Sequence, residues 1–312
     1  MLIELFNILI FPGLLFLIFF GLTAEYLDRK ICARLQNRIG PPWFQPFADF
    51  LKLLGKQDVI PEEADQTVFR IMPIIALAST ITAYLYIPTW GKKALYSFNE
   101  DLIVILYLLF IPTLTYFLGG WYSRSIYSMI GAIRSLTQMF AYEVPLFLTI
   151  LASALLANTW SLSGMVHFYA VHPGYWAFNI LGFSISVIAL LGKLEKVPFD
   201  IPEAETEIAA GTFTEYSGRN LAFFRLSMDI ELVVVASLMA AIFLPFGLNL
   251  SPLGCFIGYL VQIVFIIFLV SLLRSAFARL RLDQMINLCW KYLAPLAFLQ
   301  VLFNLILKGV LL

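Results

Sequence analysis

The chain has 312 residues, of which 61% are hydrophobic and 13% are charged, and its 20 basic residues balance its 20 acidic residues. Soluble domains carry about 25% charged residues, so this composition excludes an ordinary soluble protein and indicates a membrane protein. The balanced charge argues against a basic nucleic-acid-binding surface, and we expect no nucleic-acid partner. Met1 to Glu4 lack the positive charge that begins a signal peptide, so the first apolar stretch is predicted to be a retained helix.

Eight apolar stretches are long enough to cross a membrane, since a helix needs about 20 apolar residues to span the hydrocarbon core. The predicted fold is an all-α polytopic membrane protein with about eight transmembrane helices, forming a single membrane-embedded domain over residues 1–312. Proline inside several spans is compatible with this fold, because packed neighbours can satisfy the carbonyls that proline frees. The predicted spans are 3–23, 68–87, 102–120, 139–157, 176–194, 230–248, 255–273 and 292–312.

Lysine and arginine are distributed unevenly between the loops. All of them except Lys92, Lys93 and Lys308 lie in, or at the edges of, the first, third, fifth and seventh loops. The positive-inside rule therefore places these loops in the cytoplasm and both termini outside. Nearly all the acidic residues lie on the same side, so this face is predicted to suit a protein partner better than an anionic lipid surface.

The first loop, residues 24–57, is long and rich in Arg, Lys, Asp and Gln. A Gly-Pro-Pro turn at 40–42 is followed by residues 47–54, which are predicted to form a short amphipathic helix in the membrane interface. The basic residues could simply hold the loop inside the cell. That reading leaves Gln45 and Asp49 unexplained, so we favour a docking surface for a partner.

The third loop leads into a helix with polar groups on one face. Arg134, Gln138 and Tyr142 recur at four-residue spacing, and Glu143 lies on an adjacent face just before an apolar run. A charge at the bilayer centre costs roughly 2.5–3.5 kcal/mol, so Glu143 is expected to face the bundle or a wet cavity. It either relays protons or pairs with Arg134 or a distant arginine to lock the bundle, and we favour the relay.

The fifth loop carries six acidic residues between positions 195 and 215. Pro198 and Pro202 are predicted to end the fifth span and to start a short helix, with Glu203 and Glu207 on one face. A solvated surface helix is one reading. We favour acids that exchange protons along a cavity or bind a basic partner. A Mg²⁺ or Ca²⁺ site is less favoured, because the spacing of an EF-hand is absent.

The chain is predicted to hold no redox centre, metal or cofactor of its own. Cys32, Cys255 and Cys289 lack the C-x-x-C spacing of iron–sulfur and zinc sites, and two histidines are too few for a haem-carrying bundle. The seventh loop is basic again. Arg279 and Asp283 are four residues apart and could pair there, and the loop is predicted to serve orientation and partner contact.

Taken together, these segments resemble subunit 1, also called H, of respiratory complex I, and most closely its relatives in the energy-converting, group 4 membrane-bound hydrogenases. The resemblance covers nearly the whole chain, and its ordered motifs are specific as a set. The matching positions are 36–41, 45, 49, 52–54, 131–143, 198–200, 202–205, 215–218, 281, 283–284 and 290–291.

The resemblance implies a non-redox anchor and coupling subunit in the cytoplasmic membrane of a prokaryote. Family members join a peripheral electron-transfer arm to antiporter-like membrane subunits that move H⁺ or Na⁺. The implied partners are hydrogenase-like large and small peripheral subunits, the antiporter-like subunits and membrane lipid. Iron–sulfur clusters, and nickel–iron in the hydrogenase type, would lie in the peripheral subunits, with ferredoxin as the implied electron donor.

The resemblance also implies two sets of site residues. The proton or coupling candidates are Glu143, Asp200, Glu203, Glu205, Glu207, Glu215 and Asp229. The candidates for docking of the peripheral arm are Arg29, Arg34, Arg38, Gln45, Asp49, Lys52, Arg134, Gln138, Arg279, Arg281 and Asp283.

The sequence departs from the respiratory pattern at several positions. Lys193 stands at the position of a family glutamate, with Glu195 two residues on, and Met228 replaces another, with Asp229 next to it. The first loop is also shorter, so it would enclose a smaller chamber. A quinone-chamber subunit of an NADH– or ferredoxin–quinone oxidoreductase is the alternative in the same class. A free-standing ion transporter and an inert membrane anchor are the rivals from other classes.

Overall fold

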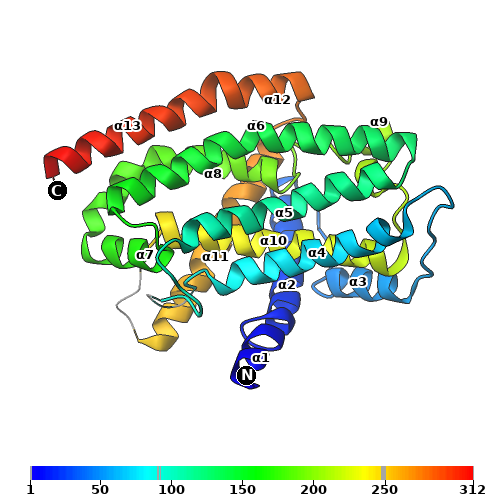
Figure 1. Cartoon of the computed structure of the whole chain (residues 1–312), viewed down its shortest axis with the longest axis horizontal. Coiled ribbons are helices and arrows are strands. Elements are labelled where there is room, and N and C mark those ends of the chain that lie inside the picture. Colours follow the sequence, from blue (N-terminus) through cyan, green and yellow to red (C-terminus); the bar gives the residue numbers. More distant parts are fainter. Residues whose placement is uncertain (1, 90, 92, 247–250, 312) are drawn as a thin grey trace.

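The computed structural model describes residues 2–89, 91, 93–246 and 251–311, and this part of the chain is helical and contains no strand. Figure 1 shows a bundle of long helices with several short ones at its ends. The elements are α1 Leu2–Leu9, α2 Leu14–Leu35, α3 Gln45–Gly55, α4 Gln66–Leu85, α5 Asp101–Tyr122, α6 Ile126–Ala157, α7 Leu162–Val171, η1 Pro173–Asn179, α8 Ile180–Lys193, α9 Glu205–Ile208, η2 Gly211–Phe213, α10 Gly218–Phe243, α11 Pro252–Ala276, α12 Leu282–Leu288, η3 Cys289–Leu293 and α13 Ala294–Leu311.

The prediction of eight membrane spans is confirmed. Within the described residues, eight helical stretches are long and apolar enough to cross a membrane. The predicted ends at residues 248 and 312 lie outside the described residues, and the side of the membrane on which each terminus lies stays a prediction. The observed stretches are Ile3–Leu35, Gln66–Leu85, Asp101–Tyr122, Ile126–Ala157, Pro173–Lys193, Gly218–Phe243, Pro252–Ala276 and Leu282–Gly309.

Several helices are longer than the predicted spans. Residues 24–35 were expected in a loop but belong to α2, and α6 begins 13 residues before its predicted span. At 1.5 Å per residue the 32 residues of α6 measure about 48 Å, whereas the hydrocarbon core is about 30 Å thick. Hydropathy marks the part of a helix that lies in the lipid and not its ends. Arg29 and Arg134 therefore stand on helical extensions.

Helix α10 occupies the centre of the bundle. It packs against α2, α3, α4 and α11, and residues 230–243 are all buried. In Figure 1, α4, α5 and α6 run across the view beside α10, while α2 and α11 run steeply to them. Helices in lipid associate through close packing of small residues, and Ala236, Ala240 and Ala241 supply these on α10. Helix α10 is thus the buried central helix against which α2, α3, α4 and α11 pack.

The two short helices predicted in the loops have different outcomes. The amphipathic helix expected at 47–54 is confirmed as α3, which has Pro46 in its first turn. The helix expected after Pro202 is only α9, four residues long, and the backbones of Ala204 and Ala209 beside it have φ values of 27° and 59°. Such left-handed residues end a helix. Glu203 therefore precedes α9, and its predicted shared face with Glu207 is wrong.

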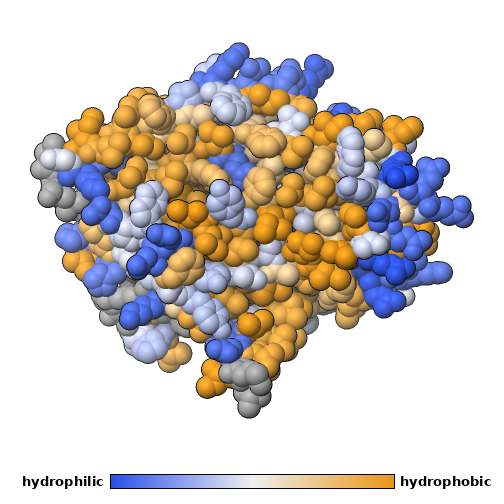
Figure 2. Space-filling model, viewed as in Figure 1, coloured by the Kyte–Doolittle hydropathy of each residue, from blue (hydrophilic) through white to orange (hydrophobic). Residues whose placement is uncertain are grey.

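Hydrophobic side chains cover much of the molecular surface. Figure 2 shows them across the middle of the molecule, while hydrophilic residues gather at the end where Figure 1 places α3, α9 and the loop after α3. This distribution fits a bundle whose sides contact lipid and whose polar end projects into water. The polar end is where the predicted site residues are concentrated.

The last helix, α13, is fastened to the bundle by a buried network of amide side chains. Asn304 donates hydrogen bonds to the Ala152 carbonyl and to Asn179 Oδ1, both at 2.8 Å. Gln300 donates to the Phe178 carbonyl at 2.8 Å. Because lipid offers no competing partners, these bonds hold α13 against α6 and η1.

We expect Asn304→Leu to loosen this attachment. The change removes both donated hydrogen bonds and leaves two buried acceptors without them, so the free energy of unfolding should fall by about 1–2 kcal/mol. Denaturation of the purified protein in detergent measures the loss. The matched control is Phe303→Leu on the neighbouring position, which is 45% exposed and should change stability much less. Equal losses in the two variants would contradict the assigned role of the network.

Candidate functional site: a charged cavity at the polar end

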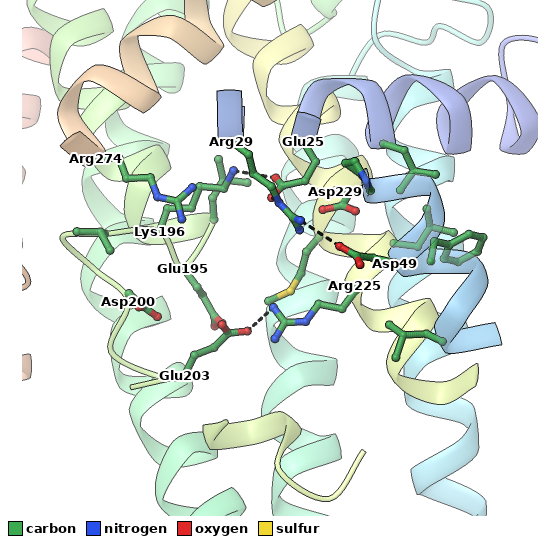
Figure 3. A pocket seen from close by; sticks show the side chains of 18 of the residues that line it. Glu25, Arg29, Asp49, Glu195, Lys196, Asp200, Glu203, Arg225, Asp229 and Arg274 are labelled. Carbon is green, nitrogen blue, oxygen red and sulfur yellow. Dashed lines mark hydrogen bonds and ion pairs between the residues drawn. The ribbon is translucent and has the colours of Figure 1, made fainter. Parts of the chain in front are cut away.

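A cavity of about 570 Å³ with a mostly charged lining is bounded by α2, α3, α10, α11 and the segment that follows α8. Figure 3 shows acidic and basic side chains projecting into it from all of these elements. Eight apolar side chains complete the lining. The charged lining residues are Glu25, Arg29, Asp49, Lys52, Glu195, Lys196, Asp200, Glu203, Arg225, Asp229 and Arg274.

Helix α2 supplies the residues on one wall. Glu25 pairs with Arg29 at 2.7 Å, as the one-turn spacing on a helix allows, and with Lys196 at 3.3 Å. Arg29 also reaches Asp49 on α3 at 3.3 Å. Gln45 donates to the other oxygen of Asp49 at 3.0 Å. The docking candidates Arg29, Gln45 and Asp49 are therefore brought together by the packing of α3 on α2.

Asp28 is fully buried and ties three parts of the chain together. It accepts from Lys196 at 2.5 Å, from Arg274 at 2.8 Å and from Ser271 at 2.6 Å. Burial alone would lower the pKa of Lys196, but Asp28 and Glu25 raise it above its ordinary value. The ammonium therefore stays charged, and its ion pairs hold the segment after α8 against α2, while Arg274 ties α11 to the same Asp28.

Glu195 lies at the inner end of the cavity. It follows α8 with φ at 50°, the left-handed conformation with which helices commonly end, and it is only 6% exposed. Ser135 donates a hydrogen bond to it at 2.7 Å. Burial raises the pKa of Glu195 to about 8, and the Ser135 hydrogen bond offsets this only in part. The side chain therefore holds a proton at neutral pH and can release it.

The cavity is also lined by Asp200, Glu203, Arg225 and Asp229. Glu203 pairs with Arg225 at 2.7 Å, as Figure 3 shows. Asp200, Glu203 and Asp229 were predicted as coupling candidates, and the structure brings them to one cavity. Asp200 and Glu203 are close enough to Glu195 to interact with it electrostatically.

A second charged cluster lies deeper in the bundle, beside α10. Lys193 pairs with Glu231 at 2.9 Å, and their side chains are 3% and 2% exposed. Lys193 also donates to the Leu109 carbonyl at 2.6 Å, and Tyr116 donates to the second oxygen of Glu231 at 3.2 Å. Glu143 and Lys193 line one small void of about 10 Å³. This places Glu143 beside Lys193 and not, as one reading expected, in a pair with Arg134.

Arg134 instead belongs to a separate surface site. Arg134 pairs with Glu207 at 2.6 Å, and Arg279 lies 3.8 Å from the same carboxylate. The hydrogen bond from Arg134 lowers the pKa of Glu207, which therefore stays ionised. With Arg281 these residues line an open cavity of about 360 Å³. Glu207 thus lies outside the main cavity.

The remaining predicted residues are dispersed. Gln138 is buried and donates to the Gly192 carbonyl at 2.8 Å, so it fastens α6 to α8 and does not fit the docking role expected for it. Glu215 is half-buried and is not among the residues that line the main cavity, and the side chain of Glu205 lies outside the described part of the structure. Arg34, Arg38 and Asp283 are exposed at the surface, and Lys52 is exposed at the cavity rim.

Sequence reasoning missed several residues of both charged clusters. Glu25, Asp28 and Arg29 recur one helical turn apart in the sequence, a signal that the predicted loop concealed. Glu231 is an acid inside an apolar run, which by itself indicates a buried role. The residues that were not proposed for the site are Glu25, Asp28, Lys193, Lys196, Arg225, Glu231 and Arg274; Glu195 was counted only among the acids of the fifth loop.

The arrangement suits movement of protons or cations better than covalent chemistry. Among the described residues, no group of three His, Cys, Asp or Glu side chains could hold a metal ion. The cavity instead offers carboxylates that can exchange protons with one another. The absence of a redox centre on this chain stays a prediction.

Comparison with known proteins identifies the family. The family model described as NADH dehydrogenase matches residues 7–305. A second H-type subunit of the NADH-quinone oxidoreductase of Syntrophobacter fumaroxidans is 34% identical over 299 residues, which cover 90% of each chain. The H-type subunit of the enzyme from Carboxydothermus hydrogenoformans is 32% identical over 301 residues, or 92% of this chain and 85% of that one. The chain belongs to the NADH dehydrogenase subunit 1/H family.

A solved structure supports the same assignment. A chain of the membrane-bound sulfane sulfur reductase, an archaeal respiratory membrane complex, superimposes with a TM-score of 0.83 at 27% identity, over 93% of this chain and 96% of that chain. The protein is thus an H-type, multi-pass membrane subunit of a respiratory oxidoreductase complex resembling NADH-quinone oxidoreductase. The family resemblance noted from the sequence is confirmed.

Glu195 should make the stability of this H-type subunit depend on pH. Between its ordinary pKa of 4.5 and about 8, the folded state keeps a proton that the unfolded state releases. Stability should therefore fall by about 1.4 kcal/mol for each pH unit across this window and level off above it. Glu195→Gln, which mimics the protonated acid, should remove this slope.

Thermal unfolding of the purified protein from pH 5 to pH 9 measures the effect. The control is Glu207→Gln, because the pKa of that exposed acid is lowered and its charge is constant over this range. Parallel pH curves for the wild type and Glu195→Gln would show that Glu195 does not titrate there.

Proposed function

We propose that this subunit couples electron transfer in a docked peripheral arm to the movement of H⁺ or Na⁺ through neighbouring membrane subunits. It would do so as a non-redox anchor in a hydrogenase-type complex. The observation that carries the proposal is a series of electrostatically interacting ionisable side chains, which begins in the cavity of about 570 Å³ and ends at Glu143 inside the bundle. Such a series is what a proton needs to cross a region that excludes water.

The series has an order along the bundle. Glu195 interacts electrostatically with Glu203 on its outer side and with Glu231 on its inner side. Glu231 is paired with Lys193, and Lys193 shares a void with Glu143. That void, of about 10 Å³, is small and lined mainly by apolar side chains, so it keeps bulk water away from the two charged groups. Charge at the cavity can therefore influence Glu143 electrostatically through Glu195, Glu231 and Lys193.

Farther along the bundle than Glu143 lies a cluster of buried polar side chains that are not carboxylates. The cluster around Asn304, Gln300, Asn179 and Tyr169 consists of amides and one phenol joined by hydrogen bonds of 2.8–2.9 Å. Amides do not release protons near neutral pH. This favours a sideways exit from Glu143, which is only partly buried, into an adjoining antiporter-like subunit.

The electrons would stay in the peripheral arm. By family likeness, a hydrogenase-like large subunit and an iron–sulfur small subunit would rest on the polar end, with ferredoxin as donor and nickel–iron or iron–sulfur centres in those partners. The exposed Arg34, Arg38 and Lys52 and the site around Glu207 offer charged contacts for such an arm. The unequal distribution of Lys and Arg supports a cytoplasmic position for this face.

Charge on the cavity walls argues for the hydrogenase type over the quinone alternative. Eleven of the 19 lining residues are ionisable, whereas sites for small organic ligands are lined mainly by apolar and aromatic side chains. The curated relatives are named for quinone, and the structural neighbour is named for sulfane sulfur. The polarity of this cavity favours a complex whose acceptor is not held here.

Glu143→Gln should uncouple the purified complex. An amide cannot carry the proton, so ion translocation into liposomes should fall by about tenfold or more, while electron transfer measured with an uncoupler stays near the wild-type rate. The control is Glu62→Gln, an exposed acid remote from the series, which should pump normally. An assembled Glu143→Gln complex that pumps like the wild type would support the inert-anchor rival.

Quinone analogues test the alternative function. We expect no saturable, inhibitor-sensitive reduction of quinone analogues by the purified complex, because the charged cavity would have to desolvate its ion pairs to admit a quinone ring. Steady-state kinetics with a series of analogues provide the measurement. Saturable reduction that responds to substitution of Asp49 or Arg225 would establish a quinone chamber instead.

A further inference from the structure

Lys193 is one buried cation that lies between two carboxylates. It lies 2.9 Å from Glu231, and together with Glu143 it lines a void of about 10 Å³. Both Lys193 and Glu231 are near enough to Glu143 to interact with it electrostatically. Leu109, whose carbonyl accepts from the ammonium at 2.6 Å, lines the same void. The ammonium thus has one carboxylate as its ion-pair partner and a second carboxylate nearby.

The charges of the three side chains do not cancel when all are ionised. Glu143, Lys193 and Glu231 together then carry one negative charge, and an uncompensated charge is costly in a region of low dielectric constant. The trio is neutral when one of its carboxyl groups holds a proton. Because Lys193 can neutralise only one acid at a time, its position decides which acid holds the proton.

The surroundings of Lys193 permit movement. Its side chain is a flexible four-carbon stem with a compact ammonium group. The ring of Tyr142 lies 6.0 Å from the ammonium, a distance at which an aromatic face attracts a cation. Tyr142 adjoins Glu143 in the sequence, so a cation leaving Glu231 meets a favourable surface near the second acid.

We propose that Lys193 is a mobile cation that moves between Glu231 and Glu143 and thereby transfers one proton at a time between them. The inference rests on the proposed coupling function and names the element that drives its inner step. In the resting arrangement Lys193 pairs with ionised Glu231 and Glu143 is protonated. A proton that reaches Glu231 from Glu195 breaks the ion pair, and Lys193 moves to Glu143, whose proton leaves toward a neighbouring subunit.

The cycle closes without a change of charge in the bundle. The proton on Glu231 then passes across the void to Glu143, and Lys193 returns to the ionised Glu231. One proton has entered from the cavity and one has left beside Glu143. Lys193 keeps its own proton throughout, and the trio stays neutral at both positions. Glu195 recovers its proton from the cavity carboxylates.

A fixed lock is the competing reading, and Lys193→Arg separates the two. Arginine keeps the charge and forms carboxylate pairs at least as strong as those of lysine, so a lock should survive the change. Its larger planar group does not fit a void of about 10 Å³, so a mobile cation should be arrested. We expect the H⁺/electron ratio of the reconstituted complex to fall by about tenfold, with uncoupled electron transfer retained.

A second variant keeps the test decisive if arginine prevents assembly. Replacing Lys193 and Glu231 together, as Lys193→Gln with Glu231→Gln, exchanges a neutral pair for a neutral pair. This variant should assemble and also lose pumping. The matched control is Lys308→Arg at the far end of the bundle, where Lys308 donates to Asn158 at 2.6 Å. That variant should pump at the wild-type ratio.

The outcomes distinguish this inference from the proposed function. If Lys193→Arg or the double variant assembles and pumps at the wild-type ratio, the mobile cation is overturned. The coupling function still stands in that case, provided that Glu143→Gln stops pumping. If Glu143→Gln itself pumps normally, the coupling function fails and the inference fails with it.

Discussion

Every charge that this fold brings inside the bundle must find a partner, and that constraint organises the polar end of the molecule. The network centred on buried Asp28 is the clearest case. It joins Lys196, from the segment after α8, to Arg274 on α11, and α2 supplies the acid itself. Leaving any one of these charges buried and unpaired would cost several kcal/mol, so the segment has one stable position. The cavity exists because this position is fixed.

Helix α10 carries charged side chains from that fixed end toward the interior of the bundle. Arg225, Asp229 and Glu231 lie on one helix at increasing depth: the first is exposed, the second lines the cavity and the third is buried in an ion pair. Because α10 packs against α2, α3, α4 and α11, these depths are set by the core of the bundle. The same apolar packing that holds the fold therefore sets the spacing of the ionisable groups.

Much of the fold could be read from the sequence, and much of the site could not. The spans follow from local hydropathy, and α3 follows from its amphipathic pattern after Gly-Pro-Pro. The pairs in the site join residues far apart in the chain, such as Asp28 with Arg274, and local patterns carry no record of them. Glu203 and Glu207 show the limit most directly. Their spacing predicts one helix face, but the left-handed backbone of Ala204 separates them, and each acid pairs with a different arginine.

Two lysines three residues apart illustrate how surroundings decide the role of a charge. Lys196 pairs with Glu25 and with Asp28 from a single position. Moving it away would therefore break both ion pairs at once. Lys193 is paired with Glu231, and a second acid, Glu143, lines a small void with it. A cation that is paired with two carboxylates at once is held in place. A cation that is paired with one carboxylate and lies near another has two alternative partners. The proposed conversion of redox energy into movement of ions needs an element with two positions, and of these two lysines Lys193 is the one with a second carboxylate outside its ion pair.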